Sequence, residues 1–381
     1  MGRAFRAAWT TASIVWAPAC HLPASAVVAP EVIEVLEENA FLERIDEHEL
    51  ARDLEALLGV EVEPQRVRAG RYWRVDLELG PLAPLDLDRP RSAALEGLRS
   101  CDLLLAKNAK AQSLGTTLSL EAFTFYDHVG LLELDENGRP WVYESWPRIS
   151  LKPLGPVFAG RFGGEVARIP LSDFVRRYET VECIRLGGMD EGESAAVLRR
   201  ARAAREHRIE YDPFHDADDP RLSCSELLVH LLGEAVRDGG ALTPAAVSRH
   251  RSVRRLLTAL GFRTDPYLVP DSFAALPGAT SVGTLSRHRD RAGLASVAVA
   301  YELLHAHFLA SDADVGIGSY VAFDRWQLVR YREATRSFLD LAAGLAAALG
   351  PWDQRSEARL RSDLTRTLPL FFRRRDPRRD L

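Results

Sequence analysis

The sequence lacks three features that would assign it to a class at once. Its 381 residues include only 4 cysteines, and no two of them form a C-x-x-C pair, so a structural zinc site is not expected. No uninterrupted apolar run reaches the ~18 residues that a membrane-spanning helix needs. The net charge of -5 gives no general basic field for nucleic acid. The sequence therefore predicts no metal or other cofactor, no nucleic-acid partner and no integral membrane span.

What is present is typical of a folded globular protein. Hydrophobic residues make up 46% of the chain and charged residues 27%, and 381 residues are too many for one ordinary core. We therefore expect two folded units with extensions. The basic segment Phe371–Arg375 is compatible with peripheral contact with an anionic surface, but a frayed basic terminus is the favoured interpretation.

The first 26 residues have the pattern of a secretory signal peptide. Two arginines precede a mildly apolar stretch over residues 7–19, and Ala24-Ser25-Ala26 has the A-x-A form of a cleavage site. A short N-terminal helix and lipoprotein processing at Cys20 are the alternatives. The expected location is the periplasm or cell envelope, or the cytoplasm if these residues are not a signal. After cleavage three cysteines remain, and this odd number favours a free thiol.

The spacing of apolar residues predicts the order of elements. Helices are expected over residues 30–60, 116–124, 171–177, 191–206 and 287–366. Strands are expected over residues 72–79, 101–106, 126–134, 141–146, 165–169 and 181–186. Strands and helices in this order predict an α+β fold, in which helices pack on one small antiparallel sheet.

Breaks in the pattern divide the chain. A proline-rich stretch at residues 81–90 separates an N-terminal extension, residues 27–97, from a central domain over residues 98–285. Within that domain residues 237–285 contain several glycines and prolines and are expected to be mostly loop. Residues 286–381 are expected to form a helical hairpin or small bundle.

The stretch around Cys224 carries the strongest chemical signal. Ser223 stands as a plausible N-cap of an apolar helix, and Glu226 follows three residues later, which is the pattern of a capping box. Cys224 would then lie in the first helical turn, where the helix dipole favours thiolate over thiol. The alternative is a small buried cysteine that only packs at a well-capped helix start.

A nucleophilic cysteine needs a base, and His128 is the candidate. It opens a predicted strand, where its imidazole can face a cleft and accept the thiol proton. A structural histidine is the alternative. Glu144 lies on the returning strand of an Asn137-Gly138 hairpin and would orient the imidazole. A two-residue turn would place His128 and Glu144 on opposite faces of the sheet. One bulged residue in the turn would place them on the same face, and the pattern alone leaves both registers open.

These residues belong to an ordered set that resembles a known family, the circularly permuted papain-like hydrolases of the YiiX/YaeF type within the NlpC/P60 group. The resemblance covers roughly residues 98–285. The matching segments are Asp102, Gln112-Ser113, Tyr126-x-His128-Val129-Gly130, Glu144, Tyr211-Asp212-x-Phe214, Cys224-Ser225-Glu226-Leu227 and Pro270-Asp271. The chain departs from the usual family pattern at two positions, with Cys101 in place of a glycine and Ser223 in place of an aromatic residue.

The resemblance implies a permuted papain-like domain with Cys224 as nucleophile, His128 as base and Glu144 as orienting carboxylate. It also implies the bulged register of the hairpin. Tyr211, Ser113 and Tyr126 are predicted to contact the substrate. The implied activity is a cysteine hydrolase that cleaves amide bonds in peptides, cell-wall peptides or isopeptides.

Two other functions remain open at this stage. A lipid acyl hydrolase or acyltransferase on the same fold would require an apolar acyl pocket. A catalytically degenerate domain would bind a partner without turnover, with the C-terminal helices as an interaction platform. The acidic loop over residues 212–219 lacks the glycine and terminal glutamate of a calcium-binding EF loop, so a solvated loop is expected there.

Overall fold

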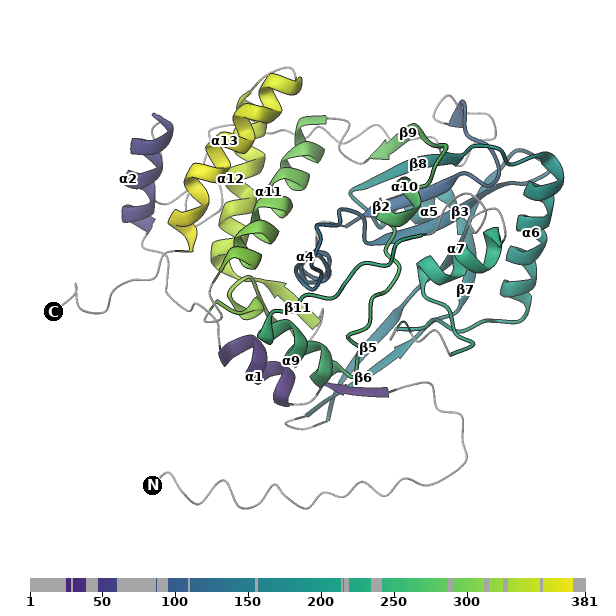
Figure 1. Ribbon diagram of the computed structural model, residues 1–381, viewed down its shortest axis with the longest axis horizontal. Coiled ribbons are helices and arrows are strands. Elements are labelled where there is room, and N and C mark those ends of the chain that lie inside the picture. The colour runs from purple at the N-terminus through teal and green to yellow at the C-terminus, as the bar shows by residue number, and fades with distance from the viewer. Residues whose placement is uncertain are drawn as a thin grey trace, which may run out of the picture.

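A six-stranded sheet with its covering helices forms one half of the computed structural model, and a group of long helices forms the other (Figure 1). The structure describes residues 25–28, 30–38, 47–59, 87, 95–108, 110–154, 157–213, 215, 219–233, 242–286, 291–311, 315–324, 328–349 and 352–372. The predicted signal peptide up to residue 24 and the predicted strand over 72–79 lie outside these residues. Within them, no helix is long and apolar enough to cross a membrane.

The sheet is antiparallel throughout and has the strand order β7-β4-β3-β2-β8-β9. Its strands are β2 (Leu103–Lys107), β3 (His128–Leu134), β4 (Pro140–Ser145), β7 (Val166–Pro170), β8 (Thr180–Leu186) and β9 (Ala279–Ser286). The central strand β2 is buried along its whole length because both faces of the sheet are covered. This arrangement confirms the α+β class and the antiparallel sheet.

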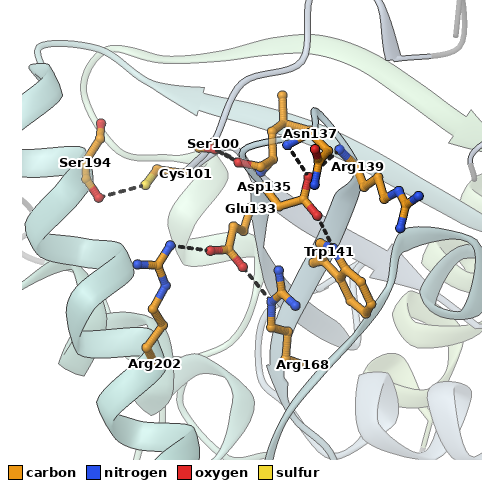
Figure 2. Close-up of polar contacts among 11 residues, drawn as sticks. Ser100, Cys101, Glu133, Asp135, Asn137, Arg139, Trp141, Arg168, Ser194 and Arg202 are labelled. Carbon is orange, nitrogen blue, oxygen red and sulfur yellow. Dashed lines mark hydrogen bonds and ion pairs between the residues drawn. The ribbon is translucent and has the colours of Figure 1, made fainter. Parts of the chain in front are cut away.

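A three-residue turn fixes the register of the β3–β4 hairpin (Figure 2). The Asp135 carboxylate accepts hydrogen bonds from the backbone N–H groups of Asn137 and Arg139 at 2.9 and 2.8 Å, and Gly138 adopts a φ of 73°. Glycine adopts this left-handed conformation without strain. Its presence in the turn makes the turn one residue longer than a two-residue hairpin turn. Leu131 consequently pairs with Tyr143. In this register His128 and Glu144 lie on the same face of the sheet, as in the bulged alternative.

On the opposite face of β3, a buried carboxylate ties the sheet to α6 (Glu191–Glu206) (Figure 2). Glu133 accepts hydrogen bonds from Arg168 of β7 at 2.6 Å and from Arg202 of α6 at 2.7 Å. Burial acts to raise the pKa of Glu133, but the two guanidinium groups outweigh it and hold that pKa below its usual range. With one guanidinium from β7 and one from α6, Glu133 anchors the helix to the sheet.

Helices cover both faces of the sheet. Leu131 and Tyr143 face a cluster with α6 and α7 (Cys224–Leu232), whereas Leu132 and Val142 face α5 (Leu171–Arg176). The short helix α10 (Asp271–Ala274) adds a further tie. Its Asp271 carboxylate accepts hydrogen bonds from the backbone N–H groups of Phe125 and Tyr126 at 2.8 and 2.9 Å, and so fixes the segment that leads into His128.

The helical half joins the two ends of the chain in one core. Its elements are α1 (Pro30–Glu38), α2 (Glu47–Leu58), α4 (Ala111–Leu118), α9 (Arg251–Leu260), α11 (Arg291–Ala310), the 3-10 turn η2 (Ile317–Ser319), β10 (Val321–Asp324), β11 (Leu328–Tyr331), α12 (Glu333–Ala348) and α13 (Gln354–Phe371). Leu36 of α1, Leu54 of α2 and Leu304 of α11 are fully buried in the same cluster. The boundaries proposed at residues 97 and 285 stay predictions, although α1 and α2 pack with helices from the far end of the chain.

Several expectations need correction. The helix expected over 116–124 begins at Ala111 and ends at Leu118. Residues 237–285 contain α9 and β9 rather than loop alone, and 287–366 contain the β10–β11 ribbon between helices. A second sheet of β1 (Ser25–Val28), β6 (Val157–Gly163) and β5 (Arg148–Leu154), in the order β1-β6-β5, was not expected. The pairings of β1 with β6 and of β9 with β8 join distant segments, which local glycine and proline signals do not predict.

Candidate active site

The cysteine helix begins as the sequence predicts. The Ser223 side chain accepts a hydrogen bond from the Glu226 N–H at 3.3 Å, and the Glu226 carboxylate accepts one from the Ser223 N–H at 2.8 Å. This capping box makes Cys224 the first residue of α7. The backbone N–H groups of Cys224 and Ser225 have no acceptor within the helix at this position. They are therefore available to a developing negative charge.

His128 is held by a carboxylate from the neighbouring strand. Its Nε2 lies 2.9 Å from Oε2 of Glu144, and both side chains are almost completely buried. The other carboxylate oxygen of Glu144 accepts a hydrogen bond from Arg177 at 2.6 Å. Because Glu144 occupies Nε2, the nitrogen that remains for a thiol is Nδ1. Arg177, just after α5, fixes Glu144 in turn.

Aromatic rings surround the imidazole. The His128 ring stacks on Tyr178 at a centroid distance of 5.6 Å and forms a T-shaped contact with Trp146 at a centroid distance of 5.1 Å. Arg177 also lies over the Trp146 ring, 4.5 Å from its centroid. These rings restrict rotation of the imidazole and keep water from its ring faces.

The environment of His128 raises the pKa of its imidazole above the ordinary value. Burial acts to lower the pKa of His128, but the charge of Cys224 and hydrogen bonds with Cys224 and Glu144 outweigh it and raise the pKa to about 9. The Cys224 side chain is only 8% exposed and lies where α7 packs against β3. The arrangement is a thiol coupled to an imidazole that a buried carboxylate orients.

A cavity of about 290 Å³ opens beside the cysteine. Tyr126 and Tyr211, two of the predicted substrate contacts, line it together with Cys224. The Tyr126 hydroxyl donates a hydrogen bond to Glu182. The third predicted contact, Ser113, is buried on α4 and is not among the described residues that line this cavity.

His215 is a cavity residue that the sequence reasoning did not select. Its ring stacks on Tyr267 at 4.4 Å, and its Nδ1 is buried without a hydrogen-bond partner among the described residues. Burial lowers the pKa of His215, so the ring is neutral near pH 7. Its φ of 52° is rare for a residue other than glycine, and strain of this kind often accompanies functional sites. Arg177 was likewise missed, because nothing in its local sequence connects it with Glu144.

Cys101 occupies a strained position at the start of the sheet. Its φ is 72°, in the left-handed region that favours glycine. The adjacent Asp102 is buried and forms two hydrogen bonds at 2.8 Å with Arg185, so it supports the fold away from the cavity.

The three described thiols should differ in reactivity toward iodoacetamide. Burial raises the pKa of Cys101 to about 11 and that of Cys183 to about 12, whereas His128 is coupled to Cys224. We expect labelling of folded protein at pH 7 to modify Cys224 and leave Cys101 and Cys183 unmodified, as mapped by peptide mass spectrometry. Labelling of all three after denaturation is the control. Equal labelling of the three in folded protein would contradict this assignment.

Comparisons with known proteins add little to this geometry. No family model and no curated protein matches the sequence. Among solved structures, the chain is similar to the metalloprotein yiiX from Escherichia coli O157:H7, which its description assigns to DUF1105. The sequence identity is 18%, the TM-score is 0.39, and the match covers 49% of this chain and 98% of yiiX. Among the residues described, no group of three or more His, Cys, Asp or Glu side chains is placed to hold a metal ion.

Proposed function

We propose that this protein is a cysteine hydrolase that works through an acyl-enzyme on Cys224. The observation that supports it most is the chain of contacts from the capped N-terminus of α7 to His128 and on to Glu144. Each member has a defined partner: Cys224 is the first residue of α7, its thiol is coupled to the His128 imidazole, and Arg177 holds the Glu144 carboxylate. This is the set of roles that activates a nucleophile and then protonates a leaving group.

The proposed reaction has two halves. The Cys224 thiolate attacks the acyl carbon, and the N–H groups of Cys224 and Ser225 stabilise the oxyanion. The His128 imidazolium then protonates the leaving nitrogen or oxygen, which leaves a thioester on Cys224. Neutral His128 takes a proton from water, hydroxide attacks the thioester carbon, and the acid product departs as the thiol is restored. Glu144 keeps the imidazole oriented through both halves.

The first candidate substrate is an amide in a peptide, cell-wall peptide or isopeptide, as the family resemblance implies. The cavity favours a second candidate, an ester or thioester of an apolar acyl chain. A stripe of aliphatic side chains lines one part of the cavity, including Val253, Leu256 and Leu260 of α9. Apolar walls bind methylenes rather than peptide groups. Export to the cell envelope remains part of the proposal.

Paired reporter substrates would test the proposal and separate the two candidates. A p-nitrophenyl ester and a p-nitroanilide with the same acyl group differ only in the bond to be cleaved. We expect wild type to release product and to show an acyl adduct on Cys224 by mass spectrometry. Cys224→Ala should reduce kcat/KM by about 1000-fold or more.

The control is Cys183→Ala, which removes a buried thiol away from the cavity and should keep turnover. Absence of both an adduct and Cys224-dependent release with either substrate would reject the enzyme. The degenerate binding domain would then be the better interpretation.

A further inference from the structure

The cavity beside Cys224 is built from both halves of the molecule. In Figure 1, α7 lies on the sheet side of α4, whereas α9 and β11 lie on the helical side. The lining nevertheless includes Cys224 of α7 together with Ile317 of η2, Val321 of β10 and Val329 of β11. The cavity therefore extends from the thiol, past α4, to the ribbon formed by residues 321–324 and 328–331.

The two ends of this cavity differ in chemistry. Near the thiol, Ser225 Oγ is buried without a hydrogen-bond partner among the described residues, and so is His215 Nδ1. Buried polar atoms without partners are costly unless a ligand or water satisfies them. Toward the ribbon the lining contains an aliphatic stripe beside the polar Gln112 and Thr116 of α4, because α9 presents apolar residues at helical spacing. These are Val253, Leu256, Leu257 and Leu260. A ligand with one polar end and an apolar tail fits both ends at once.

The wall formed by η2 and the ribbon is fixed in place. The Ile317 N–H donates a hydrogen bond to Ser252 Oγ at the start of α9, at 2.9 Å. Arg332, just after β11, donates one to the Gly318 carbonyl at 2.8 Å. The Tyr331 and Tyr301 hydroxyls are hydrogen-bonded, which ties β11 to α11. A wall held from three sides will resist a ligand rather than yield to it.

We infer that η2 and the β10–β11 ribbon close the acyl end of the cavity, and that Val329 and Val321 set the length of acyl chain delivered to Cys224. This inference rests on the proposed function for the reaction, but the shape of the cavity can be measured without turnover. It gives the C-terminal region a role in selecting substrate. The predicted ligand is an unbranched apolar acyl group whose carbonyl carbon sits at the thiol.

N-alkyl iodoacetamides of increasing chain length would measure this wall directly. Labelling of wild-type Cys224 should be faster with N-dodecyl than with N-ethyl iodoacetamide, because each buried methylene contributes a factor of about four. Val329→Phe projects a ring into the acyl end. Its N-dodecyl rate should fall by about tenfold or more, with the N-ethyl rate unchanged.

Val329 is half-buried on a strand, where phenylalanine is well tolerated, so the variant should fold. Leu339→Phe is the matched control: Leu339 is a half-buried aliphatic residue of α12 outside the described cavity lining, and both rates should stay at wild-type values. Val329→Ala enlarges the acyl end and should extend the preferred chain.

The outcomes separate this inference from the proposed function. Equal N-dodecyl rates in wild type and Val329→Phe, with Cys224 still labelled, would overturn the length-setting wall and leave the hydrolase intact. A chain-length shift in Val329→Phe without any Cys224-dependent hydrolysis would support the acyl cavity and reject the enzyme. No preference for longer chains in wild type would overturn the acyl ligand itself.

Discussion

In His128→Ala, labelling of Cys224 by iodoacetamide at pH 6 should slow by about 100-fold or more. The thiolate is the reactive species, and at this pH it depends on the imidazolium beside it. The pKa of His128 is raised to about 9, so the imidazolium persists through neutral pH. Wild type should therefore label faster than the variant at pH 6, and this difference should narrow as pH rises through about 9 and the imidazolium is lost.

The same coupling predicts how stability changes with pH. The pKa of His128 in the folded chain, about 9, lies above its ordinary value of 6.5. The imidazolium interactions therefore contribute fully below pH 6.5, and the contribution is lost as pH rises through about 9. The unfolding midpoint of wild type should therefore fall as pH rises from 6.5 to about 9. In His128→Ala this dependence on pH should be weaker.

His230→Ala supplies the control for both measurements. His230 is exposed near the end of α7 and lies six residues beyond Cys224, so it cannot reach the start of that helix. In His230→Ala, Cys224 should be labelled at the wild-type rate at each pH. A pH profile in His128→Ala that matches wild type would mean that Cys224 is not paired with His128, and the hydrolase proposal would lose its main support.

Local patterns in the sequence predicted the parts of the site that depend on short-range geometry. The capping box around Ser223 follows from a three-residue spacing, and the hairpin follows from Asn137-Gly138 between two apolar strands. The hairpin register was open from the pattern alone, because one extra residue in the turn reverses the face of Glu144. The backbone bonds of Asp135 and the φ of Gly138 decide it.

The parts that could not be predicted depend on contacts between distant segments. Arg177 reaches Glu144 across 33 positions, and Asp271 fixes Tyr126 across 145. The cavity wall also combines α9, in a stretch interpreted as loop, with a ribbon in a stretch interpreted as helix. A single sequence holds no record of such pairings, so the acyl end of the cavity emerged only from the packing.

Gly164→Ala should have the largest effect on stability of any single-methyl change near the site. Gly164 has a φ of 139°, a conformation that essentially only glycine adopts. A methyl group there would lie far inside van der Waals contact with the Trp146 carbonyl oxygen and 3.1 Å from Cβ of Tyr211. Strain and overpacking together should cost about 3–6 kcal/mol of unfolding free energy.

The change should also reach the reactive pair, since Gly164 lies between two of its supports. Trp146 forms a T-shaped ring contact with His128, and the Tyr211 N–H donates a hydrogen bond to the Gly164 carbonyl at 3.0 Å. Displacing either one moves the imidazole or the cavity wall.

The neighbouring Gly163→Ala is a matched control, because its new methyl group has no atom within 4 Å and its backbone is ordinary. Denaturation midpoints and Cys224 labelling rates of the two variants provide the comparison. Gly163→Ala should stay within about 0.5 kcal/mol of wild type, and equal midpoints for both variants would show that this close approach of backbones does not support the site.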